Sequence, residues 1–190
     1  MLLEAATEVF YQYGYNDATV DMIASTLGST KAVFYYHYSD KQSVLNGIFD
    51  NAMSAAIQVV QDAIERGGPP HVKLAGIVRN YTSWVIANRT TVGVFWREVR
   101  SLSDESRVRL DVRRQELAGM IKSVIIEGME KGDFEAEDAA SAARMILGMT
   151  SFLYTWWREN KRFNSEETAR QMSDAALRIV GAHHGRASAK

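Results

Sequence analysis

Apolar side chains recur every three or four residues along almost the whole chain. This spacing places them on one face of an α-helix. No segment combines the strict apolar and polar alternation of a half-buried strand with a hairpin turn beside it. The pattern therefore predicts an all-α protein, and its periodic segments amount to about nine helices.

Glycines and capping residues separate the first four predicted helices. The first helix is expected to stop at Gly14, whose missing Cβ permits a left-handed cap. Thr19 is a good N-cap for a second helix that Gly28 ends, and a short third helix follows over residues 31–38. A long fourth helix is expected over residues 39–64.

The sequence Gly67-Gly68-Pro69-Pro70 is the sharpest break in the chain. Five further helices are predicted after it, over about residues 72–88, 92–100, 103–131, 137–157 and 165–180. We therefore expect a small helix-turn-helix domain at residues 1–46, a larger helical domain at residues 47–182 and a frayed tail at residues 183–190.

Composition narrows the class of protein. Of the 190 residues, 46% are hydrophobic and 24% are charged, as in folded globular proteins. The absence of cysteine excludes a disulfide framework, a thiol nucleophile and a thiolate metal site. No export signal opens the sequence, and no window approaches the roughly 20 apolar residues of a membrane span. We expect a cytoplasmic protein with no membrane partner.

The titratable residues form no catalytic pattern. The four histidines, His37, His71, His183 and His184, do not combine with a nucleophile or a carboxylate pair into a catalytic set. The adjacent pair His183-His184 could bind a metal weakly, but a frayed end is the favoured interpretation. The chain also contains no phosphate-binding loop and no H-E-x-x-H motif. We therefore expect no enzyme, with no catalytic residue, no metal and no cofactor.

Residues 19–41 have the spacing of a helix-turn-helix unit. Ala24 is a small residue where two helices touch, Gly28 lies at the tight turn, and Phe34 is an apolar anchor in the second helix. Such a unit places its second helix in the major groove of DNA. A protein-interaction module would explain the helices of this chain but not this spacing.

Residues 2–50 resemble the DNA-binding domain of the TetR family of transcriptional regulators. The resemblance rests on the first-helix pattern LLEAATEVFYQYGY, the segment from Thr19 to Ala24, Gly28, and the sequence VFYYHYSDK, which looks like the family signature LYxHFxxK. It implies that the short third helix recognises an operator and that the lysine after it reaches a phosphate. It also implies that the larger domain dimerises and binds a small inducer.

Eight residues of this region are predicted to contact double-stranded DNA. Lys31 can donate to guanine, and the methyl groups of the next two residues can meet a thymine methyl. Hydroxyl groups and a second lysine suit phosphates, whereas His37 either donates to a phosphate or packs and caps the short helix. The predicted contacts are Thr19, Lys31, Ala32, Val33, Tyr35, Tyr36, His37 and Lys41.

The aromatic residues near this unit have a second interpretation, as the core of a small three-helix domain. We expect Phe34 to belong to that core. Tyr35 and Tyr36 cannot both do so, because neighbouring side chains on a helix are about 100° apart.

Charge is unevenly distributed along the chain. All 15 arginines lie at or after Arg66, and residues 1–50 have two lysines against six acidic residues, a net charge of −4. Neutralisation of phosphates normally supplies much of the affinity for DNA. Family members usually begin with a basic arm. Either such an arm precedes Met1 in the native protein, or binding relies on hydroxyl groups, helix N-termini and two lysines per subunit.

The larger domain contains all four tryptophans, with methionine and aromatic side chains that suit an adaptable apolar pocket. Core packing is the alternative for each of them. The segment SFLYTWWRENKRF resembles the end of the eighth helix in family members that respond to acyl-CoA thioesters, although Glu159-Asn160-Lys161 replaces the usual proline and glycine. A neutral or aromatic effector is the competing expectation. The predicted effector contacts are Tyr81, Trp84, Trp96, Met120, Val124, Met149, Phe152, Trp157 and Arg158.

The last two predicted helices are expected to form a dimer interface. Small residues on the helix predicted at residues 137–157 would allow a second helix to approach closely. The helix predicted at residues 165–180 has an apolar stripe. These residues are Ala139, Ala140, Ala143, Gly148 and Ser151, and then Met172, Ala176, Ile179 and Val180. Packing within the monomer is the alternative. The expectations together describe a homodimeric repressor that a small-molecule effector releases from a palindromic operator.

Overall fold

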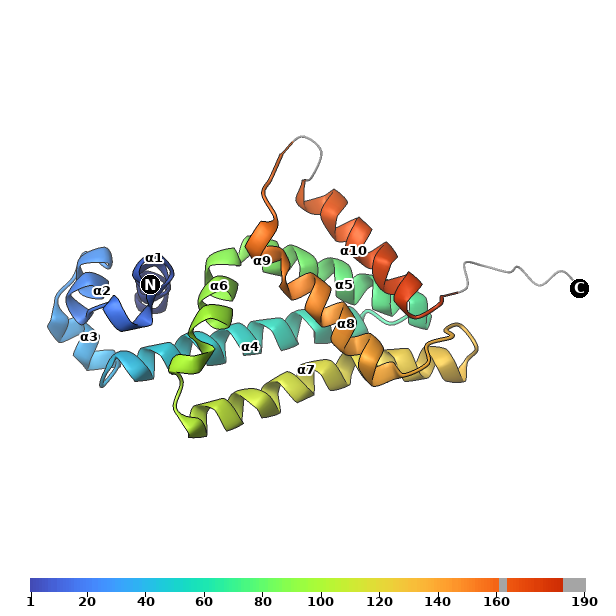
Figure 1. The fold of residues 1–190 in the computed structure, drawn as a ribbon, viewed down its shortest axis with the longest axis horizontal. Coiled ribbons are helices and arrows are strands. Elements are labelled where there is room, and N and C mark those ends of the chain that lie inside the picture. Colours follow the sequence, from blue (N-terminus) through green and yellow to red (C-terminus); the bar gives the residue numbers. More distant parts are fainter. Residues whose placement is uncertain (161–163, 183–190) are drawn as a thin grey trace, which may run out of the picture. The chain divides into compact units, whose positions relative to one another are not determined.

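The computed structural model describes residues 1–160 and 164–182, and every regular element in this part of the chain is helical (Figure 1). The predicted all-α class is confirmed, while the predicted tail at residues 183–190 lies outside the described residues. In chain order the elements are α1 (Leu2–Asp17), α2 (Val20–Thr26), α3 (Lys31–His37), α4 (Lys41–Glu65), α5 (Pro70–Ala87), α6 (Arg89–Glu98), the 3-10 turn η1 (Val99–Ser101), α7 (Asp104–Glu130), α8 (Ala139–Ser151), α9 (Leu153–Trp156) and α10 (Ser165–Ile179).

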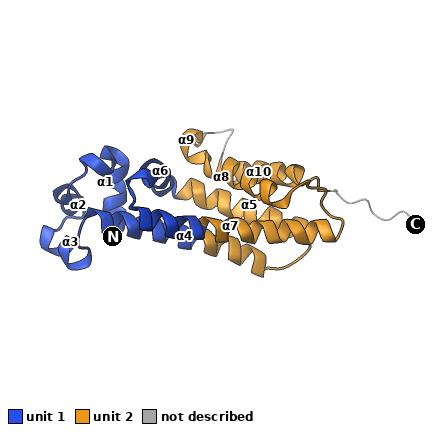
Figure 2. Ribbon diagram, turned by 60° about the horizontal axis from the view of Figure 1, so that its bottom comes forward, with its two compact units in different colours: residues 1–55, 88–113 blue, residues 56–87, 114–190 orange. Residues whose placement is uncertain are grey.

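The helices fall into two compact units, each discontinuous in sequence (Figure 2). Unit 1 comprises residues 1–55 and 88–113, and unit 2 comprises residues 56–87 and the chain from residue 114 onward. The predicted domains, in contrast, are continuous stretches that meet between residues 46 and 47. Helix α6 belongs to unit 1, whereas the sequence placed its residues in the larger domain. The division of functions between the predicted domains stays a prediction.

Unit 1 is built around α1, which packs against α2 and α6, while α2 packs against α3. Phe10 and Ile23 have no exposed surface, and Phe34 is 1% exposed. The ring of Phe95 on α6 stacks on that of Phe49 on α4, with centroids 4.6 Å apart. Phe34 is thus a core residue, as predicted.

Helix α1 is interrupted at Gly14, the glycine that was expected to stop it, and a short helical segment follows. Gly14 has a φ of +78°, so the helical geometry is interrupted there, but the helix then continues to Asp17. The N–H group of Ala18 donates to the carbonyl of Gly14 at 3.2 Å. Gly14 therefore interrupts the regular helix where the sequence predicted, because a residue without a Cβ adopts positive φ without strain, and a further helical turn follows to Asp17.

Unit 2 is a helical bundle in which α10 packs along α5, and α8 contacts both. Leu74 and Ile77 on α5, Ile121 on α7 and Ile146 on α8 are each at most 1% exposed. The predicted helix over residues 137–157 is divided in the structure, because α8 ends at Ser151 and the single turn of α9 begins at Leu153. No described helix has the length and hydropathy to cross a membrane.

Candidate DNA-binding surface and effector site

Helix α2 begins at a side-chain cap. Thr19 has extended backbone angles, and its Oγ1 accepts a hydrogen bond from the Met22 N–H at 3.2 Å. The residue is exposed. Because a hydroxyl can donate and accept at once, Thr19 can cap α2 and still donate to a phosphate oxygen.

The connection between α2 and α3 has the tight turn that the sequence predicts. Gly28 has a φ of +66°, and the N–H of Ser29 donates to the carbonyl of Ala24 at 2.9 Å. Ala24 is 5% exposed, so it permits the two short helices to meet closely. A positive φ at the turn favours glycine, which explains why Gly28 occupies this position.

The predicted contacts on α3 are all exposed, around the single buried anchor Phe34. Tyr35 is 56% and Tyr36 84% exposed, so both hydroxyl groups can reach DNA. The exposed residues of α3 are Lys31, Ala32, Val33, Tyr35, Tyr36 and His37. One short helix therefore offers a cation, two phenols, an imidazole and small apolar groups to a ligand.

Lys31, the first residue of α3, forms an ion pair with Asp21 on α2. Their Nζ and Oδ2 atoms are 2.8 Å apart, and both side chains are more than half exposed. The hydrogen bond to Asp21 and the charge of that carboxylate raise the pKa of Lys31. The lysine therefore stays fully cationic at neutral pH, but an acidic side chain shares its charge.

Lys41, the first residue of α4, makes hydrogen bonds within the protein. Its Nζ donates to three backbone carbonyl oxygens, those of Tyr15, Asn16 and Ala18. The predicted phosphate contact followed from the family resemblance, in which the lysine after the third helix reaches a phosphate. In the structure the residue is only half-exposed and its donors are directed at the protein itself.

In unit 2, Tyr81 is the centre of a buried polar contact. It is 7% exposed, and its hydroxyl lies 3.0 Å from Oγ of Ser151 on α8. Burial raises the pKa of Tyr81, while the Ser151 hydrogen bond and the charge of Arg114 on α7 act in the opposite direction. The Trp84 ring stacks on Tyr81 at 5.8 Å between centroids. The structure thus brings together two of the predicted effector residues, Tyr81 and Trp84. Their neighbour Ser151 was predicted from the sequence only for the dimer interface.

The other predicted effector residues are more dispersed. Val124 is buried, whereas Met120 and Met149 are half-buried and Phe152 is 60% exposed. Trp96 belongs to unit 1 and is 43% exposed, so the structure does not group it with the residues of unit 2.

Trp157 and Arg158, which carried the acyl-CoA resemblance, differ in exposure. Trp157 is buried, and its Nε1 donates to Thr168 Oγ1 on α10 at 2.9 Å. Arg158 is exposed and donates to the backbone carbonyl of Trp157 at 2.8 Å. The tryptophan thus connects the end of α9 to α10, and the arginine is the more accessible of the two.

The dimer-interface prediction needs a correction at several positions. Ala143, Ala176 and Val180 are at most 1% exposed in the single chain. They face the core of unit 2, so their small or apolar side chains serve packing within the subunit. Gly148, in contrast, is exposed.

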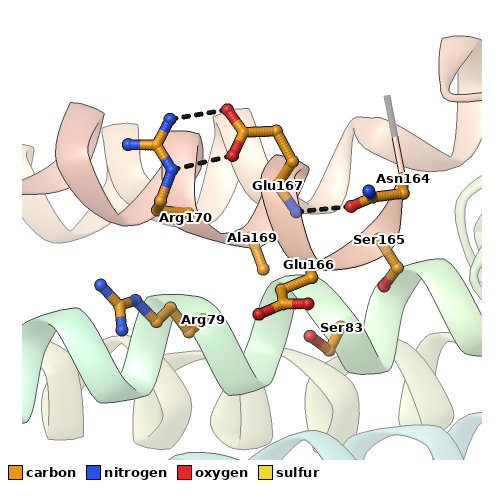
Figure 3. A pocket seen from close by; sticks show the side chains of 8 residues that line it. All are labelled: Arg79, Ser83, Asn164, Ser165, Glu166, Glu167, Ala169 and Arg170. Carbon is orange, nitrogen blue, oxygen red and sulfur yellow. Dashed lines mark hydrogen bonds and ion pairs between the residues drawn. The ribbon is translucent and has the colours of Figure 1, made fainter. Parts of the chain in front are cut away.

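A surface hollow of about 550 Å³ lies between α5 and α10 (Figure 3). Seven of its eight lining residues have polar or charged side chains, and none of the predicted effector residues contributes to it. Asn164 caps α10 by accepting from the Glu167 N–H at 2.8 Å, and the hydrogen bond from Arg170 lowers the pKa of Glu167 to about 2. Arg170 and Glu167 are paired with each other, and Asn164 is engaged as the cap of α10, so this end of the hollow has the character of a helix junction.

Helix α3 exposes groups suited to bases and phosphates next to a capped α2, which defines a helix-turn-helix DNA-binding protein. Two family models match the chain: the bacterial regulatory proteins of the tetR family over residues 2–48, and the tetracyclin repressor-like C-terminal domain over residues 67–180. The chain belongs to the TetR family of transcriptional regulators.

Related proteins span nearly the whole chain. The fatty acid metabolism regulator protein of Bacillus subtilis is 23% identical over 184 residues, which cover 96% of this chain and 94% of that protein. A tetR-family regulatory protein from Rhodococcus RHA1 superimposes with a TM-score of 0.89 at 27% identity, over 96% of each chain. The structure of AibR with isovaleryl coenzyme A and operator DNA has a TM-score of 0.80 at 22% identity, over 96% of this chain and 97% of that one.

Proposed function

We propose that this protein is a homodimeric transcriptional repressor that a small-molecule effector releases from a palindromic operator. Residues 1–46 bind the operator, and residues 47–182 bind the effector and form the dimer. The observation that carries the DNA-binding part is helix α3, whose six exposed side chains surround one buried anchor. Because its target is chromosomal DNA, the protein works in the cytoplasm.

A dimer is supported by an exposed apolar face formed by α8 and its C-cap residue, Phe152. Met145 is 55% and Phe152 60% exposed, and the exposed Gly148 lies between them in the sequence. Their spacing of three and four residues places them on one side of the helix. A large apolar side chain in water is unfavourable, and glycine permits close approach of a second helix. A two-fold axis would pair this face with itself and present two copies of α3 to the half-sites of a palindrome.

The effector proposed for unit 2 is an acyl-CoA thioester. Its support comes from two relatives, because AibR binds isovaleryl coenzyme A and the Bacillus subtilis protein regulates fatty acid metabolism. In this chain the Tyr81 and Ser151 hydroxyl groups, 3.0 Å apart, supply a buried donor for an acyl carbonyl. The exposed guanidinium of Arg158 suits a phosphate.

A neutral or aromatic effector is the second candidate. It is favoured by the stacking of Trp84 on Tyr81, with rings inclined by only 20°. Such a pair offers flat apolar surface beside a single polar contact, which is typical of pockets for uncharged ligands.

Release from DNA requires the effector to distinguish two states of the dimer. An effector that binds the DNA-free state more tightly than the operator-bound state lowers operator affinity by the same ratio. An effector with equal affinity for both states would change nothing, however tightly it bound.

A thermal-shift panel tests the effector class. Acyl-CoA thioesters of different chain length are compared with the matching free acids and with uncharged aromatic compounds. A ligand at 100 times its Kd stabilises the folded state by about 2.7 kcal/mol, which is a measurable rise in Tm. We expect the thioesters to give this rise and Tyr81→Phe to reduce it. Stabilisation by the uncharged compounds alone would reject the acyl-CoA proposal.

The DNA-binding role is tested with a double variant, Lys31→Ala with Tyr36→Ala. Both side chains are exposed on α3, so the variant should keep the wild-type dimer and nearly its Tm. We expect it to abolish the gel shift of a duplex recovered from a randomised pool with the wild-type protein. Unchanged binding of that duplex would reject the assignment of α3.

A further inference from the structure

The ammonium group of Lys41 is surrounded by backbone oxygens. Nζ donates to the carbonyl of Tyr15 at 2.5 Å, of Asn16 at 3.1 Å and of Ala18 at 2.7 Å. A lysine has three N–H donors, so these contacts account for all of them. The same nitrogen lies 4.6 Å from the centroid of the Tyr15 ring, which adds a cation–π contact.

The three carbonyls lie where α1 ends and α2 is about to begin. The last carbonyl groups of a helix have no partner within it and carry partial negative charge, so a cation is favourable there. The interruption of α1 at Gly14 makes this end irregular. Ala18 is followed directly by Thr19, the cap of α2. Lys41 therefore holds Ala18, the residue that directly precedes the helix-turn-helix unit.

The surroundings of Lys41 hold it firmly in place. The Ser43 N–H donates to Asp40 Oδ1 at 2.7 Å, which caps the start of α4. The Tyr15 hydroxyl donates to Gln42 Oε1 at 3.1 Å, and the Tyr15 ring meets Phe10 edge-on at 5.4 Å. The first turn of α4 and the end of α1 are thus joined by several contacts, of which Lys41 makes the charged ones.

We propose that Lys41 is a positioning residue, which holds the junction of α1 and α2 so that Thr19 and α3 meet DNA in the correct orientation, and which contributes no phosphate contact of its own. The proposal rests on the DNA-binding function proposed above. A phosphate would have to displace carbonyls from an ammonium group that they already saturate. The hydrogen bonds from the ammonium group to these carbonyls are themselves charge-assisted, so their loss offsets the gain from a phosphate.

The salt dependence of DNA affinity separates the two roles of a lysine. Loss of a phosphate contact makes the plot of log affinity against log salt less steep by about 0.9, hence by about 1.8 for two subunits. We compare Lys41→Met with Lys122→Met, a matched control on an exposed position of α7. The duplex is the one selected from a randomised pool.

For Lys41→Met we expect an unchanged salt slope, an affinity lower by about tenfold or more and a Tm lower by about 5 °C. Lys122→Met should match the wild type in all three measurements. The loss of affinity at a temperature well below the Tm is the effect that a merely structural role would not produce. A slope reduced by about 1.8 with an unchanged Tm would overturn the proposal.

Lys41→Arg is the second test, because it keeps the charge. An arginine would preserve a phosphate contact, but its flat guanidinium cannot direct three donors at converging carbonyls from the position of an ammonium. We therefore expect a loss of Tm and affinity similar to that of Lys41→Met. Wild-type behaviour of Lys41→Arg would overturn the positioning role. A selection that recovers no duplex would instead overturn the DNA-binding function itself.

Discussion

At the scale of single residues, the ion pair between Lys31 and Asp21 should have two opposing effects on the DNA binding proposed for α3. It orders a lysine at the start of α3, but it also keeps a carboxylate within 2.8 Å of that lysine. Exposed ion pairs contribute about 0–1 kcal/mol, so DNA can readily replace Asp21 as the partner of Lys31. The carboxylate then remains close to the phosphates and repels them.

Asp21→Asn should therefore bind the selected duplex more tightly than the wild type, by about threefold to tenfold at low salt. The gain should shrink as salt is added, because exposed charges are screened. Fluorescence anisotropy at several salt concentrations measures it. Asp62→Asn, an equal change of charge at an exposed position of α4, is the control and should have little effect. Weaker binding by Asp21→Asn would show that ordering of Lys31 matters more than repulsion.

The sequence was sufficient to predict that α3 has exposed side chains. It was not sufficient to predict the backbone carbonyls that surround Lys41. Helical geometry requires at least one of Tyr35 and Tyr36 to lie outside the core, and the structure exposes both around the buried anchor Phe34. The partners of Lys41 lie 23 to 26 residues earlier in the chain. Their position depends on how α1 bends at Gly14 and how α4 packs, which no local pattern in the sequence encodes.

At the scale of the elements, helix periodicity and caps predicted the position of most helices. The segments expected at residues 72–88 and 165–180 correspond to Pro70–Ala87 and Ser165–Ile179. Two features differ, namely the continuation of α1 to Asp17 and the break between α8 and α9. The return of α6 to α1 could not be predicted either, because it depends on packing between helices distant in sequence.

One glycine of α7 is required by packing, which gives a sharp prediction of stability. A Cβ on Gly128 would overlap the ring of Phe134, which is 3% exposed and has little room to move. Gly128→Ala should therefore destabilise the protein by about 2 kcal/mol, which lowers the Tm by about 6 °C. Thermal unfolding followed by circular dichroism measures this change.

Gly119, on the same helix, is the matched control. No atom lies within 4 Å of the Cβ that Gly119→Ala would add. Alanine has the higher helix propensity, so this variant should be more stable than the wild type by about 0.5–1 kcal/mol. Equal and small effects of both substitutions would contradict the close contact of Phe134 with α7.

At the scale of the whole molecule, dimerisation should matter more than usual for DNA affinity. Residues 1–50 of each subunit have a net charge of −4 and two lysines, one paired with Asp21 and one with backbone carbonyls. A single copy of α3 therefore has little general attraction for phosphates. Linking two copies makes the second binding event intramolecular, and affinity rises by about 10²–10⁴ without any new contact.

Phe152→Glu should expose this dependence. It places a charge on the apolar face of α8, at a side chain that is already 60% exposed, so the subunit should keep its fold. We expect light scattering to show a monomer, and affinity for the selected duplex to fall by about 100-fold or more. Val108→Glu likewise introduces a glutamate at an apolar side chain, one that is 65% exposed on α7, and should leave the dimer intact. A Phe152→Glu monomer with wild-type affinity would mean that one subunit is sufficient to read the operator, and the link between dimer geometry and release by an effector would then fail.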